Sequence, residues 1–404
     1  MPESETPQTT QPTRPYIGGQ AVLEGVMMRA PTSFAVVVRR RDGSLHVRER
    51  EMVDGRQGLA KLPLARGVAS LVESLRLGSE ALRFSAEQME RDLEAEEAAA
   101  KAPPKKKSTG GGVTGAMLSM LRAIGYSLFL LTTTEGDGVP SSEKEKEKAK
   151  GRSGGMTLML VLMVGFMIAL PQFAAASLNG ALKLNFDVQS PQFQAMTGAF
   201  KLAIVIGYLV TVRRVFPDIR RVFQYHGAEH KTISTYEANE DLTVENARKK
   251  TTLHPRCGTT FLVMVALVSI LVFTAVGGFL PKIHTGKAWL DNVLFFLEKL
   301  PFLPLIAAVT FEIQRVFARY CTTGPLRVLL WPGFLCQKIT TIEPDDDQLE
   351  IALASLRVTL FRETAEEAKA KVSGVEPKAE NVPADVRYAS FDALMKSPRL
   401  RRAA

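Results

Sequence analysis

The chain has 404 residues, of which 46% are hydrophobic, and a formal net charge of +9. This length allows two or three structural units. The three cysteines lie far apart, at Cys257, Cys321 and Cys336, which excludes a disulfide framework. The basic excess fits loops retained on the cytoplasmic side of a membrane. Because no basic patch is interleaved with aromatic residues, we expect no nucleic-acid partner.

The first 90 residues predict a disordered start followed by a soluble unit. Residues 1–15 are polar and rich in proline, and they do not have the pattern of a signal peptide. Residues 16–90 predict a cytosolic α/β unit. The valine-rich run from Phe34 to Arg40 and the segment from Leu45 to Met52 have the composition of strands, and Asp42-Gly43 between them is a hairpin turn signal.

Two other features belong to this unit. Between Leu59 and Met89, apolar residues recur at helical spacing, which predicts an amphipathic helix packed on the strands or lying on the membrane. The segment before the strands contains Gly18, Gly19 and Glu24. Glu24 is a candidate site residue, whereas glycine-rich turns are more often structural, so both interpretations stay open.

The middle of the chain predicts a membrane domain over residues 156–344. It follows a linker at 91–155, which contains an apolar helix at 113–131 that we place at the membrane interface, leaving open whether it crosses. Four apolar runs predict transmembrane helices: Met156–Leu178, Ala199–Val212, Thr259–Leu280 and Val293–Phe317. The fold class is therefore a predominantly α-helical integral membrane protein with a small N-terminal β-containing unit and interfacial helices.

The distribution of arginine and lysine predicts the orientation of these helices. Basic residues concentrate in the loop 213–258 and near both ends of the domain, so the loop and both termini should be cytoplasmic. This corresponds to a multi-pass protein of the bacterial inner membrane. Residues 326–339 are apolar but too short to span, which predicts a re-entrant or interfacial segment. Residues 345–371 predict a cytosolic helix, and 372–404 a disordered tail.

The cytoplasmic loop contains the sequence His226-Gly227-Ala228-Glu229-His230, an H-x-x-E-H pattern. On a helix, residues four apart lie on one face, so His226 and His230 could bind one metal ion. Glu229 would then be the general base for a water held by that metal. The order is the inverse of the zinc-protease signature. A single such motif also occurs by chance, because histidines near a membrane can simply cap helices or contact headgroups.

A second cluster of ligand-type residues follows at His254 and Cys257, which offer an imidazole and a thiol suited to zinc. Glu237 lies nearby and is a possible additional site residue. Glu312 is another, because a carboxylate inside an apolar run needs a partner or an ion. It could face the histidines or pair with Arg315 on its own helix.

Several long motifs occur in order along the chain: Gly18–Met27, Phe223–Lys231, Thr243–Asn246, His254 with Arg256–Gly258, and Pro332–Gly333 followed by Thr340–Pro344. Together they resemble the bacterial YqhQ-like family, membrane proteins of unknown function that are generally described as metal-dependent enzymes. The resemblance covers most of the chain from Tyr16 to Leu356. It implies an architecture and a suspected metal, but it does not imply a substrate.

Two functions remain open at this point. The first is a membrane-embedded, metal-dependent hydrolase at the cytoplasmic face. His226, His230 and either His254 or Cys257 would hold zinc, and the substrate would be a peptide or a lipid-linked ester or amide. The second is a non-enzymatic scaffold, or a lipid- or ion-handling protein, in which four protein ligands close a structural site. In both cases the lipid bilayer is the expected partner, and the oligomeric state is open.

Overall fold

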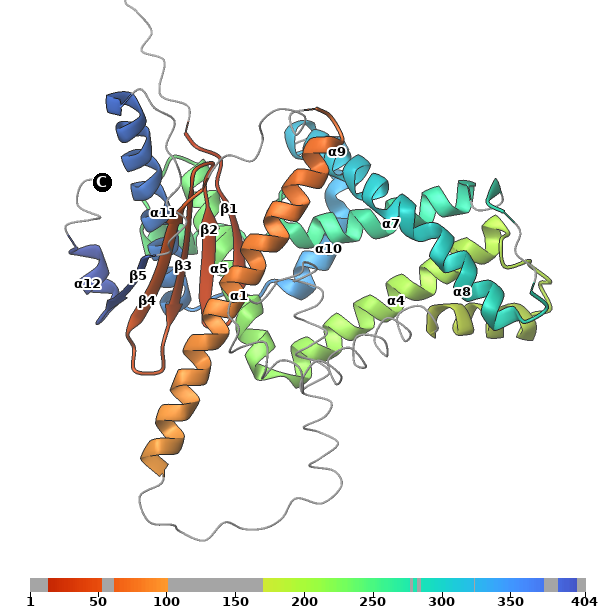
Figure 1. The fold of residues 1–404 in the computed structure, drawn as a ribbon, viewed down its shortest axis with the longest axis horizontal. Coiled ribbons are helices and arrows are strands. Elements are labelled where there is room, and N and C mark those ends of the chain that lie inside the picture. The colour runs from red at the N-terminus through yellow and green to blue at the C-terminus, as the bar shows by residue number, and fades with distance from the viewer. Residues whose placement is uncertain are drawn as a thin grey trace, which may run out of the picture.

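The computed structural model describes residues 14–52, 62–100, 170–276, 279–281, 285–322, 324–373 and 384–397. In this part of the chain, helices predominate and a small antiparallel sheet lies at one end of the molecule (Figure 1). The sheet adjoins a group of long apolar helices that extend away from it. The predicted fold class is confirmed to this extent: a mostly helical protein with a small β-containing N-terminal unit.

The sheet has five strands in sequence order, and each neighbouring pair is antiparallel. The strands are β1 (Gly18–Val22), β2 (Gly25–Arg29), β3 (Ser33–Arg39), β4 (Leu45–Glu51) and β5 (Ala384–Tyr388). The predicted hairpin is confirmed as β3 and β4, and Gly43 in its turn has the positive φ of 81° that glycine adopts without steric cost. The first hairpin, β1–β2, was not predicted, because its glycines weaken the strand signal.

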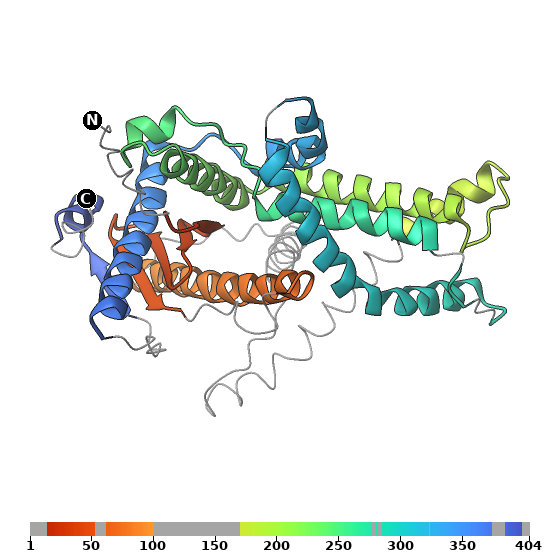
Figure 2. The ribbon, with the colours of Figure 1, turned by 90° about the horizontal axis from the view of Figure 1, so that it is seen from above.

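The sheet is covered on both faces because valines alternate from one face to the other along β3. Val36 and Val38 pack against α1 (Ala65–Ala100), where they meet Leu77 and Phe84. Val37 points the other way, into a core formed with α5 (Pro217–Glu237) and α11 (Asp346–Ser373). Figure 2 shows α1 and α11 on opposite sides of the strands.

Within the described residues, three helical stretches are long and apolar enough to cross a membrane. They are α4 (Pro191–Val215), α7 (Gly258–Val276) and the stretch Val293–Tyr320, which runs through the end of α8 (Ala288–Lys299), the 3-10 turn η3 (Leu300–Phe302) and α9 (Leu303–Tyr320). They correspond to the second, third and fourth predicted spans. Most of the first predicted span, residues 156–169, and the apolar helix at 113–131 lie outside the described residues.

Prolines define where several of these helices begin. Pro217 is at the first turn of α5, where its missing N–H costs nothing, and Phe216 before it is extended, so α4 and α5 meet at a bend. Pro301 lies within η3, and Pro304 lies in the first turn of α9, as expected from the predicted break in the fourth span. The bend at Phe216 turns the chain from α4 into the helix that carries the H-x-x-E-H motif.

The predicted re-entrant segment at 326–339 consists of η4 (Pro325–Leu330) and α10 (Trp331–Thr340). A short helix, α6 (Val244–Arg248), lies in the loop after α5.

The C-terminal tail differs from the prediction of disorder over 372–404. Residues 384–397 contain β5 and α12 (Phe391–Met395). Arg48 of β4 binds Asp385 through two contacts of 2.8 Å, and Leu394 is fully buried against the sheet. These partners are more than 300 residues away in the sequence, so local composition did not reveal them. The helix α1 also extends ten residues into the predicted linker at 91–155.

Candidate metal centre

The H-x-x-E-H motif lies on α5, as its spacing predicted. His226 and His230 are one helical turn apart, and their ring centroids are 4.4 Å from each other. Both rings point towards the loop that precedes α7. A Cβ at Gly227 would lie 2.1 Å from the carbonyl oxygen of Ile342, so only glycine lets this loop-facing side of α5 approach the segment after α10 so closely.

Two backbone carbonyls fix the orientation of the histidine rings. The Nδ1 of His226 lies 2.9 Å from the carbonyl oxygen of Thr340, and the Nδ1 of His230 lies 2.5 Å from that of Thr252. A carbonyl oxygen only accepts, so each Nδ1 carries the proton and donates. In the neutral ring, each Nε2 then presents a lone pair. This is the arrangement in which histidines bind metal ions.

Cys257 completes a group of three ligand atoms. Its Sγ lies 3.1 Å from the Nε2 of His226, and the ligand atoms of Cys257, His226 and His230 all lie within 4.8 Å of one another. Tetrahedral zinc with bonds of about 2.0–2.3 Å brings such atoms to about 3.3–3.8 Å apart, so little movement would be needed. The Nε2 of His230 is buried and has no hydrogen-bond partner among the described residues. These residues therefore fit a zinc-type ion.

The electrostatics of the group favour a thiolate. Burial tends to raise the pKa of Cys257, but His226 and His230 beside it outweigh burial and bring the pKa well below its usual value. Burial conversely opposes charge on His226, yet the neighbouring Cys257 raises its pKa to about 9. Burial lowers the pKa of His230. The thiolate is the form in which cysteine binds metals.

Glu229 lies beside the group of three. It is only 5% exposed, and one carboxylate oxygen accepts the backbone N–H of Ala21, whereas Oε2 is buried without a hydrogen-bond partner in the described part of the chain. Burial raises the pKa of Glu229 to about 8, the nearby Cys257 adds to this, and His226 opposes it. A buried carboxyl oxygen without a partner calls for an explanation such as a catalytic role or a bound water or ion.

The N-terminal glycine motif makes room for this carboxylate. A Cβ at Gly19 would lie 2.8 Å from both the Cγ and the Oε1 of Glu229. Ala21, two residues on along β1, supplies the N–H that holds the same side chain. The glycine motif therefore lines the site, and Gly19 is required there because a larger side chain would collide with Glu229. No sequence pattern indicates that these two motifs meet.

His254 and Glu237 lie next to the group but are engaged with other partners. The backbone N–H of His254 donates to Gln337 Oε1 at 2.8 Å, and Gln337 Nε2 donates back to the His254 carbonyl at 2.7 Å. The His254 ring places Nε2 3.3 Å from Glu237, which also forms an ion pair with Arg256. Its ring centroid is 5.6 Å from that of His230. The structure does not bring His254 or Glu237 into the group of three.

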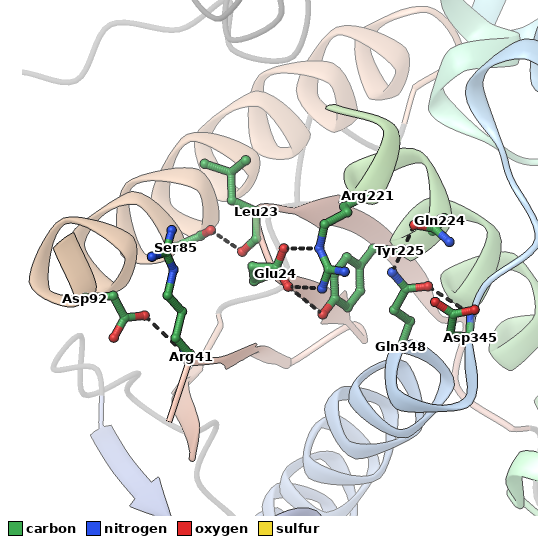
Figure 3. Close-up of polar contacts among 10 residues, drawn as sticks. All are labelled: Leu23, Glu24, Arg41, Ser85, Asp92, Arg221, Gln224, Tyr225, Asp345 and Gln348. Carbon is green, nitrogen blue, oxygen red and sulfur yellow. Dashed lines mark hydrogen bonds and ion pairs between the residues drawn. The ribbon is translucent and has the colours of Figure 1, made fainter. Parts of the chain in front are cut away.

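Glu24 lies in the β1–β2 turn and contacts α5 residues outside the group of three. Its carboxylate forms two contacts with Arg221, of 2.5 and 2.6 Å, and accepts the Tyr225 hydroxyl at 3.2 Å (Figure 3). The backbone of Glu24 has a positive φ of 52°, which is unusual for a residue other than glycine. Ser85 of α1 donates to the carbonyl of Leu23 in the same turn, as Figure 3 also shows. These contacts hold the turn between α1 and α5.

Glu312 is paired with Arg66 at the start of α1, through contacts of 2.7 and 2.5 Å. Of the two partners considered from the sequence, the histidine cluster and Arg315, neither is hydrogen-bonded to Glu312, and its partner Arg66 is 246 positions away. Two residues along, Gln314 of α9 does reach the site, since its Nε2 donates to the carbonyl of Cys257 at 3.2 Å. Gln314 and Gln337 are the site-supporting residues that the sequence did not indicate, because a polar amide in an apolar helix is a weak signal by itself.

Fold and site together define a protein with an α/β unit joined to long apolar helices and a buried His/Cys cluster beside the junction. The chain belongs to a family described as protein of unknown function (DUF1385), whose model matches residues 62–362. It is 28% identical over 361 residues to the uncharacterised protein YqhQ of Bacillus subtilis (strain 168). The alignment covers 89% of this chain and 96% of that protein. The resemblance to the YqhQ-like family is thereby confirmed. No solved structure matches the chain.

Proposed function

We propose that this protein is a metal-dependent hydrolase of the bacterial inner membrane, with zinc held by His226, His230 and Cys257. One observation carries the proposal: three ligand atoms converge within 4.8 Å beside a buried carboxylate oxygen that has no partner among the described residues. Catalytic zinc sites use three protein ligands drawn from histidine, cysteine and carboxylate side chains. The three ligands leave a fourth position of a tetrahedral ion for water or substrate.

The engagement of His254 supports an open rather than a closed site. A structural zinc site uses four protein ligands, and His254 is the residue that would supply the fourth. Its ring nitrogen faces Glu237 instead, and its backbone is held on both sides by Gln337. Turning the ring towards the metal would break its contact with Glu237. This favours the hydrolase over the structural scaffold that the sequence left open.

Each residue of the site then has a defined task. A bound zinc ion would act as a Lewis acid and bring the pKa of water towards neutrality. The carbonyls of Thr340 and Thr252 keep Nε2 of both histidines available as ligands. Ala21 anchors one oxygen of Glu229, so that Oε2 can take a proton from the attacking water and return it to the leaving group. The reaction would be hydrolysis of an ester or amide.

The surroundings of the site suggest where the substrate is. The cluster lies at the start of α7 and close to the end of α4, two of the helices that could cross a membrane. Arg213 and Arg214 at the end of α4 and the basic loop around the site favour the cytoplasmic face. We propose a peptide or lipid-linked substrate that reaches the site at this membrane surface.

The proposal is tested by measuring zinc and its ligands in the purified full-length protein. We expect stoichiometric zinc, absent from the His226→Ala variant, and an X-ray absorption spectrum with sulfur, imidazole nitrogen and one additional light-atom ligand. Unchanged zinc absorption in a His254→Gln variant would agree with an open site. A spectrum in which a third imidazole is lost in His254→Gln would instead support a closed structural site, and a zinc-free wild type would contradict both.

A further inference from the structure

The segment from Pro325 to Thr340, formed by η4 and α10, has an unusual distribution of side chains. Its large apolar residues point outwards: Leu326, Val328, Leu329, Trp331 and Leu335, with Trp331 58% and Leu335 56% exposed. Apart from Leu330, its buried positions are small or polar: Gly333, Cys336, Gln337 and Thr340. This is the reverse of a helix on a water-soluble surface. An exposed apolar face of this kind marks an interaction surface.

The position of the segment identifies what covers that face. Arg213, at the end of α4, donates to the carbonyls of Lys338 and Ile339 at 2.6 and 3.1 Å. Gly333 lies so close to Thr260 in the first turn of α7 that an added Cβ would be 2.3 Å from its Cγ2. The segment therefore lies across the site-side ends of two candidate spans. Its ten-residue helix rises about 15 Å, half of what crossing would need.

The polar residues of the segment fit a membrane surface. Arg327 and Lys338 are exposed next to the apolar face, and Arg213 contacts the backbone at Lys338. Arginine and lysine at this depth pair with anionic headgroups, and tryptophan prefers the boundary between headgroups and acyl chains. An apolar face flanked by cations is the composition of an in-plane membrane helix. A protein partner would have to bury these cations as well.

The opposite face of the same segment holds the candidate metal site. Thr340 accepts the Nδ1 proton of His226, and Gln337 clamps the backbone of His254 and reaches the hydroxyl of Thr260 at 2.5 Å. A change in the depth of α10 would move these groups directly. Lipid on one side and a metal ligand on the other are thus separated by a single helix.

We infer that η4–α10 is embedded in the acyl chains of the leaflet on the metal-site side, and that this embedding positions His226. The inference rests on the proposed membrane location and metal site. If so, the lipid leaflet helps to hold His226 in position. The embedding also predicts that a substrate anchored in this leaflet has its reactive group at the depth of the site.

The embedding is tested with tryptophan fluorescence, since the chain has two tryptophans and a Trp289→Phe variant leaves Trp331 alone. The protein is placed in vesicles of phosphatidylcholine and phosphatidylglycerol. Lipids brominated near the headgroup end of the acyl chain should quench Trp331 several-fold more than lipids brominated near the chain terminus. Aqueous iodide should have little effect. Strong iodide quenching, or protection from both iodide and brominated lipid by a second copy or a protein partner, would overturn the inference.

The link to the site is tested with a matched pair on α10 in the Trp289→Phe background. Leu335→Asp and Lys338→Asp both add a carboxylate at an exposed position, but only the first places it in hydrocarbon. Leu335→Asp should reduce quenching by brominated lipid several-fold and lower zinc content, whereas Lys338→Asp, which loses only a headgroup contact, should reduce quenching much less and leave zinc content unchanged. Equal effects of the two would contradict the lipid-facing assignment. Lost quenching with full zinc would overturn the coupling to His226.

The fluorescence of Trp331 does not depend on zinc, so the two proposals fail separately. A zinc-free protein with Trp331 in the acyl chains contradicts the hydrolase and leaves the embedding intact. A zinc-containing protein with Trp331 exposed to iodide contradicts the embedding and leaves the hydrolase proposal intact. If Leu335→Asp does not accumulate, the quenching of Trp331 in the parent variant still decides the embedding.

Discussion

The histidines of α5 and the histidine of the following loop have the same chemistry but different surroundings. His226 and His230 use Nδ1 for backbone carbonyls, which leaves Nε2 facing a thiol or no described partner at all. His254 faces Glu237 with its Nε2. Whether a histidine is available as a metal ligand depends on what its two ring nitrogens contact, and a sequence motif alone does not reveal this.

The largest effect expected from this comparison is on metal content. His230→Ala removes one of three ligands and should release zinc, because an open site cannot spare a ligand. His254→Ala removes a residue from outside the group and should keep stoichiometric zinc. Both are measured by elemental analysis of protein purified under the same conditions. Equal loss in both variants would make His254 a ligand and remove the distinction between the two regions.

Glu229 and Glu237, the two glutamates of α5, should differ in the same way. Glu229→Gln keeps the size of the side chain but cannot accept a proton, so hydrolysis should fall by about 100-fold or more while zinc stays bound. Glu237→Gln removes the carboxylate partner of His254 and Arg256 and should lower turnover only a few-fold. A fluorogenic peptide library and a fluorogenic acyl ester serve as probes. If Glu229→Gln loses its zinc as His230→Ala does, Glu229 is a ligand and its role as general base is refuted.

Two glycines allow close packing around α5, and replacing either with alanine should destabilise the protein. Gly227→Ala places a methyl group 2.1 Å from a backbone oxygen, and Gly19→Ala places one 2.8 Å from the Glu229 side chain. Each should cost about 1–3 kcal/mol, as overpacking usually does. Gly258→Ala is the matched control, because nothing lies within 4 Å of an added Cβ there. The measurement is the midpoint temperature of thermal unfolding of the three variants.

We expect the unfolding temperature of Gly227→Ala to be lower than that of Gly19→Ala. The Glu229 side chain can move away from an added methyl group, whereas the backbone carbonyl of Ile342 moves less easily. A Gly19→Ala variant should also hold Glu229 in a changed position and lose turnover. If Gly258→Ala unfolds as early as Gly227→Ala, close packing around α5 does not explain the glycines.

The features that could be predicted from the sequence are those set by residues close together in the chain. The helical spacing of His226 and His230 and the turn signal between β3 and β4 are local patterns, and both were predicted correctly. The orientation of His254 depends on Gln337, which is 83 residues away, and Glu312 pairs with a residue 246 positions away. Single-sequence patterns contain no information on such pairs, so the partners of these residues could not be foreseen.

The smallest effect is expected at Glu24, the acidic residue of the glycine motif. Its carboxylate is fully engaged by Arg221 and Tyr225 and lies in a turn, away from the group of three. Glu24→Gln keeps a hydrogen-bonding side chain but removes the charge of a partly exposed ion pair, which should lower the free energy of unfolding by about 1 kcal/mol or less. Zinc content and turnover should stay near those of the wild type.

Arg221→Gln provides the matched test of the same ion pair from α5. If Glu24 and Arg221 serve only to hold the β1–β2 turn on α5, the two single variants and the double variant should lose similar stability, since each removes one interaction. A loss of turnover of the size expected for Glu229→Gln, seen in Glu24→Gln but not in Arg221→Gln, would instead place Glu24 in the chemistry. The comparison between engaged and free side chains around α5 would then no longer separate structural from catalytic residues.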